Sequence, residues 1–254
     1  MKILILSGES DFFFHALVES LNGLDCQLAH AHFPINHEEL EQFNPDIILH
    51  NIKDVARLDY KDVITIGVND LKENNCFSLS DHTSENFINP FVVLRNNSLK
   101  DERYKSDVVY IGDPRALPST IVDIQNNDSI KYKIINNTPS SIKNYSGSCA
   151  FHNYKKFFHM AKCSIVSKNE SDTTIYSSKL LDIIYSDGNP VVHKEDDQLV
   201  ADIHDAVAGK SFKADFISRQ DIISSYTSHD RMAEILMKTG LSKMSTMVLN
   251  NKGR

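Results

Sequence analysis

Short apolar runs alternate with stretches of helical spacing through the first half of the chain. Continuous apolar runs at Lys2–Leu6 and Ile47–His50 are typical of strands that are buried on both faces of a parallel sheet. Shorter runs at Cys26–Ala31 and Val63–Val68 fit further strands, and Phe12–Leu21 repeats its apolar residues at helical spacing. This alternation predicts a doubly wound α/β domain.

Polar residues mark the ends of the predicted helices. Ser10 or Asp11 can cap the first helix, and Asn22-Gly23 can close it. A second, acidic helix is expected at Asn36–Gln42, before the turn that leads into the third strand.

The second half of the chain shows the same alternation of strands and helices. The expected strands are Asp107–Ile111, Tyr132–Ile135, Cys163–Ser167 and Pro190–His193. The expected helices are Leu117–Asn126, Tyr154–Ala161, Ser178–Tyr185, Asp197–Ala208 and Arg219–Met237. The halves are not sequence repeats, so the shared order predicts an α/β protein of two Rossmann-like domains that face a cleft.

A polar stretch separates the two halves. Arg95–Ser106 (RNNSLKDERYKS) has no apolar side and is therefore the expected linker. We predict an N-terminal domain over residues 1–100 and a C-terminal domain over residues 101–240. The pattern of residues 241–254 is weak, so we expect a loosely attached tail there.

Composition narrows the function classes. The 254 residues include 27 Lys and Arg against 34 Asp and Glu, and a net charge of −7 argues against a general nucleic-acid binder. With 41% hydrophobic residues the chain can form a core. No apolar run approaches the ~18 residues of a membrane span, and MKILILSGES lacks the apolar stretch of ~7–15 residues of a signal peptide. We therefore expect a cytoplasmic protein, in the host cytoplasm if its source is viral.

Residues that often bind metals are scattered. The four cysteines form no CxxC pair and are Cys26, Cys76, Cys149 and Cys163. We expect reduced thiols that pack in the interior rather than a zinc site. His30 and His32 alternate with Ala29, Ala31 and Phe33, so we interpret them as one face of a strand.

Four lysines lie close together in the sequence of the second half. They are Lys155, Lys156, Lys162 and Lys168. A basic patch for nucleic acid is one interpretation, but a solvated face is the simpler one.

Three segments of the second half share their order and spacing with a known family. Asp107–Gly112 (DVVYIG) is a strand that ends in a glycine turn. Tyr154–Val192 runs from a helix through a strand and a loop to K-L-L-D on a helix and then G-N-P-V-V on a strand, and Tyr226–Leu236 contains the H-x-R element of His229 and Arg231. In these features the stretch resembles the C-terminal domain of GT-B glycosyltransferases, most of all the CgeB-like and capsule-type enzymes that use nucleotide sugars.

The resemblance implies a short GT-B-like protein with a nucleotide-diphosphate sugar as its donor substrate, and neither a metal nor another cofactor. The implied donor-binding residues are Gly112, Arg115, Asn153, Tyr154, Ser177, Ser178, Lys179 and Asp182. Helix N-termini and glycine turns present N–H groups to phosphate. Lys179 or Arg115 would neutralise the leaving diphosphate, and Asp182 would accept ribose hydroxyls.

Each of these residues also has a purely structural interpretation. Lys179 and Asp182 can form an i,i+3 ion pair on a surface helix. Gly112-Asp113-Pro114-Arg115 can be a plain turn. His152 and Asn153 can line a nucleobase pocket, but N-capping by Asn153 is the favoured interpretation.

The resemblance places the catalytic base in the N-terminal half, in a loop that faces the acceptor. The candidates are Glu9, Asp81 and His82, because loops at strand ends often bear catalytic groups. The acceptor is left open among a glycan, a lipid, a protein and a modified DNA base. A homo-oligomer is compatible with all of these.

The sequence departs from the family pattern in three ways. Asp182 stands where the family has Glu, and the spacing from it to Pro190 differs by one residue, which a bulge at Asp187-Gly188 would explain. The chain is short for its class, and Ser7-Gly8-Glu9-Ser10 has one glycine where two are usual. The alternatives are therefore a non-catalytic or partner-dependent binding relative of the fold and, less favoured, a nucleotide-sugar epimerase.

Overall fold

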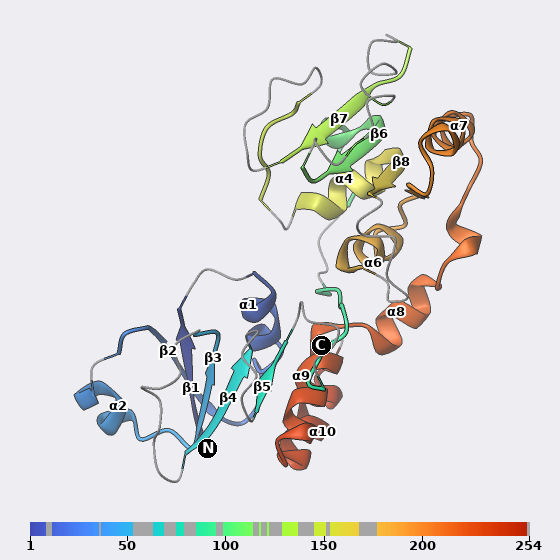
Figure 1. The fold of residues 1–254 in the computed structure, drawn as a ribbon. Helices are drawn as coiled ribbons and strands as arrows, with labels where there is room; N and C mark the ends of the chain where they lie inside the picture. Colours follow the sequence, from blue (N-terminus) through green and yellow to red (C-terminus); the bar gives the residue numbers. More distant parts are fainter. Residues whose placement is uncertain are drawn as a thin grey trace. The chain divides into compact units, whose positions relative to one another are not determined.

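The computed structural model divides into two compact units, shown in Figure 1. The first unit contains Met1–Leu94 and Tyr226–Arg254, and the second contains Arg95–Ser225. The structure describes residues 1–8, 12–35, 37–52, 63–68, 75–78, 85–94, 99–113, 117, 121, 129–136, 145–150, 153–167 and 177–252, and for residues 12 and 37 it describes the backbone alone.

A parallel five-stranded sheet forms the centre of the first unit. In spatial order its strands are β2 (Gln27–His32), β1 (Lys2–Ser7), β3 (Ile47–His50), β4 (Ile64–Val68) and β5 (Cys76–Phe77). Helices α1 (Phe12–Glu19) and α2 (His37–Phe43) connect the first three strands. Because every strand runs the same way, all of their carboxyl ends meet at one edge of the sheet.

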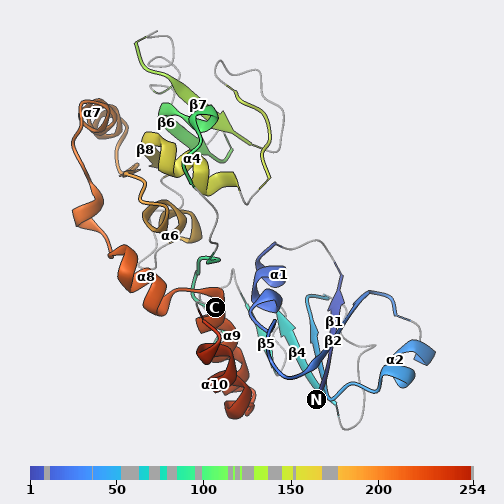
Figure 2. The same ribbon diagram turned by 180° about the vertical axis from the view of Figure 1, so that it is seen from behind.

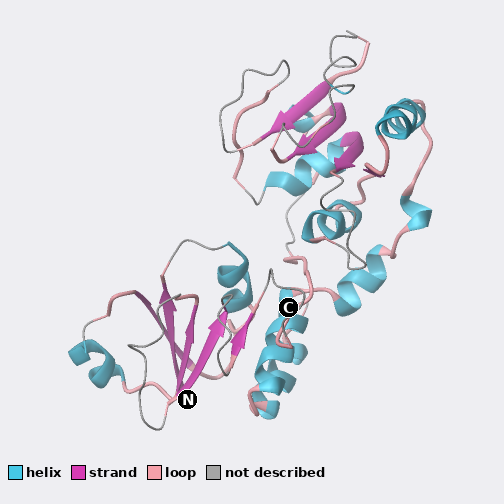
Figure 3. Ribbon diagram, viewed as in Figure 1, coloured by secondary structure: helices cyan, strands magenta, loops and turns pink. Residues whose placement is uncertain are grey.

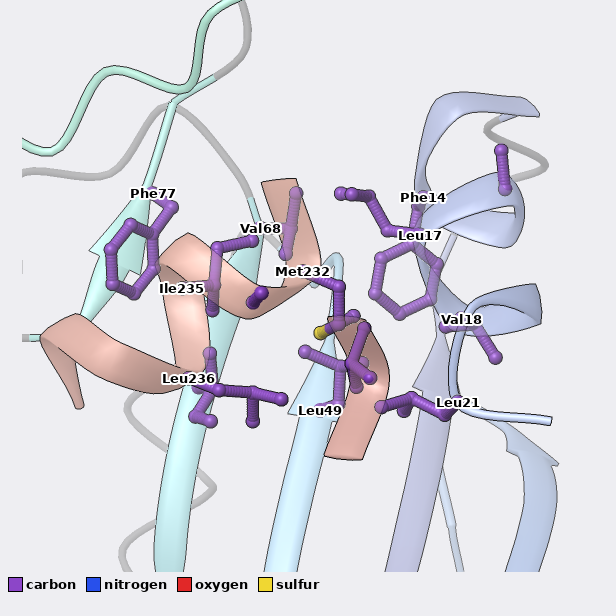
Figure 4. Close-up of a cluster of buried hydrophobic side chains, with 14 of the residues drawn as sticks. Phe14, Leu17, Val18, Leu21, Leu49, Val68, Phe77, Met232, Ile235 and Leu236 are labelled. Carbon is purple, nitrogen blue, oxygen red and sulfur yellow. The ribbon is translucent and has the colours of Figure 1, made fainter. Parts of the chain in front are cut away.

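The two last helices of the chain complete the core of the first unit. They are α9 (Ser228–Lys238) and α10 (Ser242–Asn250), which lie side by side in both views (Figures 1 and 2). Met232 and Leu236 of α9 pack among α1 and strand residues such as Leu17 and Leu49 (Figure 4). Met244 and Val248 belong to the same cluster. The prediction of a loose tail over residues 241–254 is therefore wrong, since apolar residues of α10 are part of this core.

The predicted single helix Arg219–Met237 is two helices, α8 (Arg219–Ser225) and α9. Between them the backbone of Tyr226 and Thr227 pairs with Val92: the Val92 N–H donates to the Tyr226 carbonyl, and the Ser228 N–H donates to the Val92 carbonyl. Thr227 then starts α9 with a capping box, because its side chain and that of Asp230 each accept from the other's backbone N–H. The division between the two units also falls at this break.

A parallel four-stranded sheet forms the centre of the second unit. Its strands are among those drawn in magenta in Figure 3. In spatial order its strands are β7 (Tyr132–Ile135), β6 (Ser106–Ile111), β8 (Ala161–Val166) and β9 (Pro190–Val192). Its helical elements are η2 (Glu102–Tyr104), α4 (Tyr154–Met160), α6 (Ser178–Tyr185), α7 (Asp196–Val207), η5 (Lys213–Asp215) and α8. The predicted class, α/β with two Rossmann-like parallel sheets, is confirmed.

Several boundaries differ from the predictions. The division after Leu94 lies within a few residues of the predicted boundary at 100, but residues 226–240 belong to the first unit rather than the C-terminal domain. Part of the predicted linker is structured, because Asp101 caps η2 and Ser106 begins β6. The predicted helix at Leu117–Asn126 lies mostly outside the described residues. Cys76 and Cys163 are buried, as predicted for packing thiols, whereas Cys26 and Cys149 are only partly buried.

Candidate functional site

The turn after β6 lies at the carboxyl edge of the second sheet. Gly112 has φ of +154°, and a Cβ built there would lie 2.8 Å from the Tyr110 hydroxyl oxygen and 3.3 Å from Lys179 Nζ. The Tyr110 hydroxyl donates to the carbonyl oxygen of Asp113 at 3.1 Å and holds the turn. Glycine is therefore favoured at this position, both for its backbone conformation and for the space beside it.

Helix α6 begins at the same edge, because it connects two parallel neighbours and must start where β8 ends. Ser177 is its N-cap, and the Ser177 Oγ accepts from the Leu180 N–H at 3.2 Å. The predicted start of this helix at Ser178 is confirmed. The first-turn N–H groups of a helix have no partner four residues back and attract anions.

Lys179 joins these two features. Its ammonium lies 5.6 Å from the centre of the Tyr110 ring and beside Gly112. The structure thus brings Gly112, Ser177, Ser178 and Lys179 together at one strand edge. A cation, a helix N-terminus and a close-approach glycine form an arrangement that can bind a phosphate-like anion.

Asp182 does not belong to this surface. Its side chain is buried, and its Oδ1 lies 3.4 Å from Nζ of Lys155, which is buried too. The predicted i,i+3 pair with Lys179 is therefore wrong, and so is the solvated face for Lys155. Burial raises the pKa of the Asp182 carboxyl, although Lys155 acts in the opposite direction.

The Lys155 ammonium also lies over the Tyr185 ring, 4.5 Å from its centre. The Arg219 guanidinium is 5.2 Å from the centre of the same ring, and Arg219 Nε donates to the Tyr185 carbonyl oxygen. These contacts tie α4, α6 and α8 together. They make Asp182 an anchor of the helix that presents Lys179.

Asp187 and Gly188, the positions of the expected bulge, close the end of α6. Asp187 adopts a left-handed conformation with φ of +59°, and the Gly188 N–H donates to the Ile183 carbonyl. A Cβ at Gly188 would lie 2.8 Å from the Phe158 carbonyl oxygen. These two residues thus form a helix C-cap that packs against α4.

The remaining predicted donor residues have mixed outcomes. Asn153 stands at the N-cap position of α4, but its side chain makes no capping hydrogen bond, so the favoured capping role is wrong. Tyr154 is partly buried, and burial raises the pKa of its phenol. A role of either residue at a nucleobase stays a prediction. Glu9, Asp81, His82, Arg115 and His152 lie outside the described residues.

The sequence analysis missed His50 and Asn51, two polar residues at the carboxyl edge of the first sheet. The Gly8 N–H, just after β1, donates to the Asn51 Oδ1 at 2.7 Å, just after β3. The chain leaves these strands toward opposite faces, because α1 packs on one side and Ile52 on the other. Ligands of open α/β sheets bind at such a point. The signal was His50-Asn51, a polar pair that ends a buried apolar strand.

His50 is fully buried beside this point. Its Nδ1 accepts from the Ile52 N–H at 3.2 Å, so the proton is on Nε2, which has no partner within the described part of the chain. Burial lowers the pKa of His50 to about 4. The imidazole is therefore neutral at physiological pH.

Neither a metal-ligating cluster nor a membrane-spanning helix occurs among the described residues. Among those residues, no group of three or more His, Cys, Asp or Glu side chains is placed to hold a metal ion. None of the helices in the described ranges combines the length and apolarity needed to span a bilayer.

Comparison with known proteins gives distant structural likenesses. No protein-family model matches the sequence, and no curated protein matches it. A structure of an α1,3-fucosyltransferase has 13% identity and a TM-score of 0.48 over 98% of this chain and 90% of that chain. An α1,3-fucosyltransferase with GDP-fucose has 14% identity and a TM-score of 0.39 over 88% of each chain.

A third likeness is to an NAD-complexed D-isomer specific 2-hydroxyacid dehydrogenase from Lactobacillus delbrueckii ssp. bulgaricus. It has 10% identity and a TM-score of 0.23 over 99% of this chain and 97% of that chain. With TM-scores below 0.5, these likenesses do not assign the chain to a family. The CgeB-like and capsule-type resemblance stays a prediction.

Proposed function

We propose that the chain is a glycosyltransferase that moves a sugar from a nucleotide-diphosphate donor to an acceptor hydroxyl. The observation that supports this most is the position of Lys179. Its ammonium lies beside Gly112 at the carboxyl edge of the second sheet, next to the start of α6. That edge is where open α/β sheets bind nucleotides.

In this proposal the second unit binds the diphosphate of the donor. The Lys179 ammonium offsets the charge that develops on the leaving diphosphate, so this step requires no metal ion. The hydroxyls of Ser177 and Ser178 and the first-turn N–H groups of α6 bind phosphate oxygens. Gly112 lets the phosphates approach the backbone.

Asp182 has a different role in this proposal from the one the resemblance implied. Because its carboxyl is buried against Lys155, it holds α6 in place rather than accepting ribose hydroxyls. Arg115 remains the candidate for a second cation, and Asn153 and Tyr154 remain the candidates for the nucleobase.

The base that activates the acceptor comes from the first unit in this proposal. The candidates are Glu9, which follows Gly8 in the sequence, and Asp81 and His82. The acceptor class stays open among a glycan, a lipid, a protein and a modified DNA base.

The test is calorimetric titration of the full chain with GDP, UDP, GDP-fucose and UDP-glucose. We expect one nucleotide to bind, and Lys179→Ala to weaken its Kd by about tenfold or more, because an ion-paired hydrogen bond to phosphate is lost. Lys105→Ala is the matched control. Lys105 is exposed and precedes β6, at the amino edge of the same sheet.

Three results distinguish the alternatives. Equal binding by the parent and Lys179→Ala would refute the proposed site. Failure of the parent to bind any member of the panel would refute the donor-binding proposal. Binding without release of nucleoside diphosphate in the presence of glycan, lipid, protein and DNA acceptors would favour the non-catalytic or partner-dependent relative.

A further inference from the structure

Strand β2 forms one outer edge of the first sheet, since β1 is its only neighbour among the described strands. The two strands pair in an uninterrupted parallel register. The N–H groups of Gln27 and Phe33 donate to carbonyl oxygens at the two ends of β1, so the odd-numbered residues of β2 direct their backbone groups at β1. The backbone N–H and C=O groups of Leu28, His30 and His32 therefore point away from the sheet, and they form the outer edge of β2.

The other edge strands of the two described sheets are protected against pairing with another chain. Folded proteins shorten, charge or cover such edges, because a row of unpaired backbone groups readily pairs with a further strand. β5 and β9 are short, with two and three residues. β7 contains Lys133, and the segment after it covers its edge: the Ser146 N–H donates to the Ile134 carbonyl, and the Asn136 N–H donates to the Gly147 carbonyl.

The outer edge of β2 has none of these protections. The strand is six residues long, and its sequence QLAHAH contains no Lys, Arg, Asp, Glu or Pro. Its register with β1 has no bulge, and the side chains of His30 and His32 are exposed. Within the described ranges, no strand and no turn supplies a backbone partner to the outward groups of this edge. A long, uncharged edge of this kind is where another strand can add.

The geometry of this edge suits a second copy of the same strand. Two identical edges related by a two-fold axis pair antiparallel, so that each residue and its counterpart exchange places across the axis. Only the outward residues can exchange hydrogen bonds with the added strand. The register that uses all of them places His30 opposite His30 of the second copy and Leu28 opposite His32. Each of these facing pairs exchanges both of its N–H···O bonds.

Charge and side-chain size also favour self-pairing. Like charges directly opposite each other destabilise a strand pair. β2 has no formally charged side chain at pH 7, so a second copy brings no like charges together, whereas a charged strand would find no counter-charge. On one face of the strand the side chains are Ala29 and Ala31, which pack partly buried against the core and are too small to hinder a neighbour.

We propose that the outer edge of β2 pairs with β2 of a second copy of this chain, so that the two first units share one continuous sheet in a homodimer. The second copy adds at the side of the sheet, so the strand ends near Gly8 and Asn51 stay open to a ligand. The proposal goes beyond the transferase proposal and does not depend on it, because no residue of the second unit supplies any of these hydrogen bonds.

The test is sedimentation velocity of the full chain from about 1 to 300 µM, a range that spans the Kd of small, transient interfaces. We expect the 28.8-kDa monomer to convert to a dimer as the concentration rises. His30→Lys should weaken the dimer Kd by about tenfold or more, because it places two ammonium groups opposite each other at the two-fold axis. His30→Gln keeps a neutral side chain there and should dimerise like the parent.

Asn250→Lys is the matched control for added charge, because Asn250 is exposed at the end of α10 in the same unit. It should dimerise like the parent. Since the His30 side chain is exposed, His30→Lys should melt like the parent at a concentration where both are monomers.

Amide hydrogen exchange gives a second readout at single residues. Raising the protein concentration should slow exchange at Leu28, His30 and His32, whose N–H groups point outward. Exchange at Ala29 and Ala31 should change little, because their N–H groups already face β1.

A parent chain that stays monomeric over the whole range would overturn the proposal. A dimer that His30→Lys does not weaken, or one that leaves exchange at Leu28, His30 and His32 unchanged, would also overturn it, because the copies would then meet through another surface. These experiments contain no nucleotide, so the failure of the proposed donor site would leave their results unchanged.

Discussion

The two units use the same parallel-sheet construction but differ in how the chain completes them. The second unit is one continuous stretch, Arg95–Ser225. The first unit is discontinuous, because its sheet is covered by α9 and α10 from the far end of the chain. A pattern that is local in sequence therefore describes the second unit better than the first.

The units also differ in chemistry at their carboxyl edges. In each, a central strand ends at a glycine: β1 is followed by Gly8, and β6 by Gly112. The Gly8 N–H is bound by the neutral amide of Asn51, whereas Gly112 has Lys179 beside it. Among the described residues, the glycine after β1 thus meets a neutral amide and the glycine after β6 meets a cation, and a cation beside the backbone suits an anion.

The largest effect is expected from deleting residues 241–254. Met244 and Val248 are buried in the core of the first unit, and truncating one large buried side chain costs about 2–5 kcal/mol. Since domains are stable by about 5–15 kcal/mol, the deletion should unfold the first unit. Circular dichroism and amide exchange would show this. Met237→Ala, at an exposed position of α9, is the control and should leave the melting curve nearly unchanged. An unchanged melting curve for the deletion would contradict the contribution of α10 to this core.

The next largest effect is expected for Asp182→Ala. It leaves the Lys155 ammonium buried without its partner, which typically costs about 3–5 kcal/mol. Urea unfolding would measure this, and the double variant Lys155→Met with Asp182→Leu should recover much of the loss. If Asp182→Ala instead lowered nucleotide affinity at unchanged stability, the ribose role would be restored and the anchoring role refuted.

The stability of the first unit should depend on pH through His50. Burial lowers the pKa of His50 to about 4, from an ordinary value of 6.5. Between these values the unfolded chain binds a proton that the folded chain does not, so stability falls as the pH falls. The loss from pH 7 to pH 5 is about 2 kcal/mol. Urea unfolding at the two pH values measures this loss of stability, and in His50→Gln the loss should be smaller by this amount. If the variant and the parent lose the same stability from pH 7 to pH 5, His50 is not the source.

The smallest effects are expected from replacing Gly8 and Gly112, the glycines that follow β1 and β6. Gly112→Ala should cost about 1–3 kcal/mol, because it combines a positive φ with a contact 2.8 Å from the buried Tyr110. Gly8→Ala should cost less, because its nearest contact is 3.3 Å from the Ile52 side chain. Thermal unfolding would measure both. Gly209→Ala, with φ of +112° and open space, isolates the backbone contribution. Equal losses at Gly112 and Gly209 would mean that the contact at Tyr110 adds nothing.

Local patterns predicted the elements of both sheets well. Ile47–His50, Tyr132–Ile135 and Ser178–Tyr185 have the predicted bounds, because a buried apolar run and a capped amphipathic segment are local signals. The same is true of the start of α6, where Ser177 caps the helix as its residue type indicates. Lys179 was singled out through the family resemblance, and the confirmed helix start places it in the first turn of α6.

Contacts between distant segments were beyond such patterns. The i,i+3 spacing of Lys179 and Asp182 indicated an ion pair, but the tertiary fold turns Asp182 inward to Lys155, 27 positions earlier in the chain. Asn51 follows a strand, as many polar residues do. Only the folded sheet shows that its side chain accepts a hydrogen bond from the Gly8 N–H. The position of β2 at the edge of its sheet likewise follows from the order of the strands, which no spacing rule gives.

The sequence alone determined the α/β class, the positions of most strands and the start of the helix that bears Lys179. These depend on hydrophobic periodicity and capping, which act over a few neighbouring residues. Only the tertiary structure decided which unit α10 completes, which partner neutralises Asp182 and which strands lie at the edges of the sheets. Those outcomes depend on burial and charge pairing between residues far apart in the chain, where the free energy is set by packing and desolvation rather than by local preference.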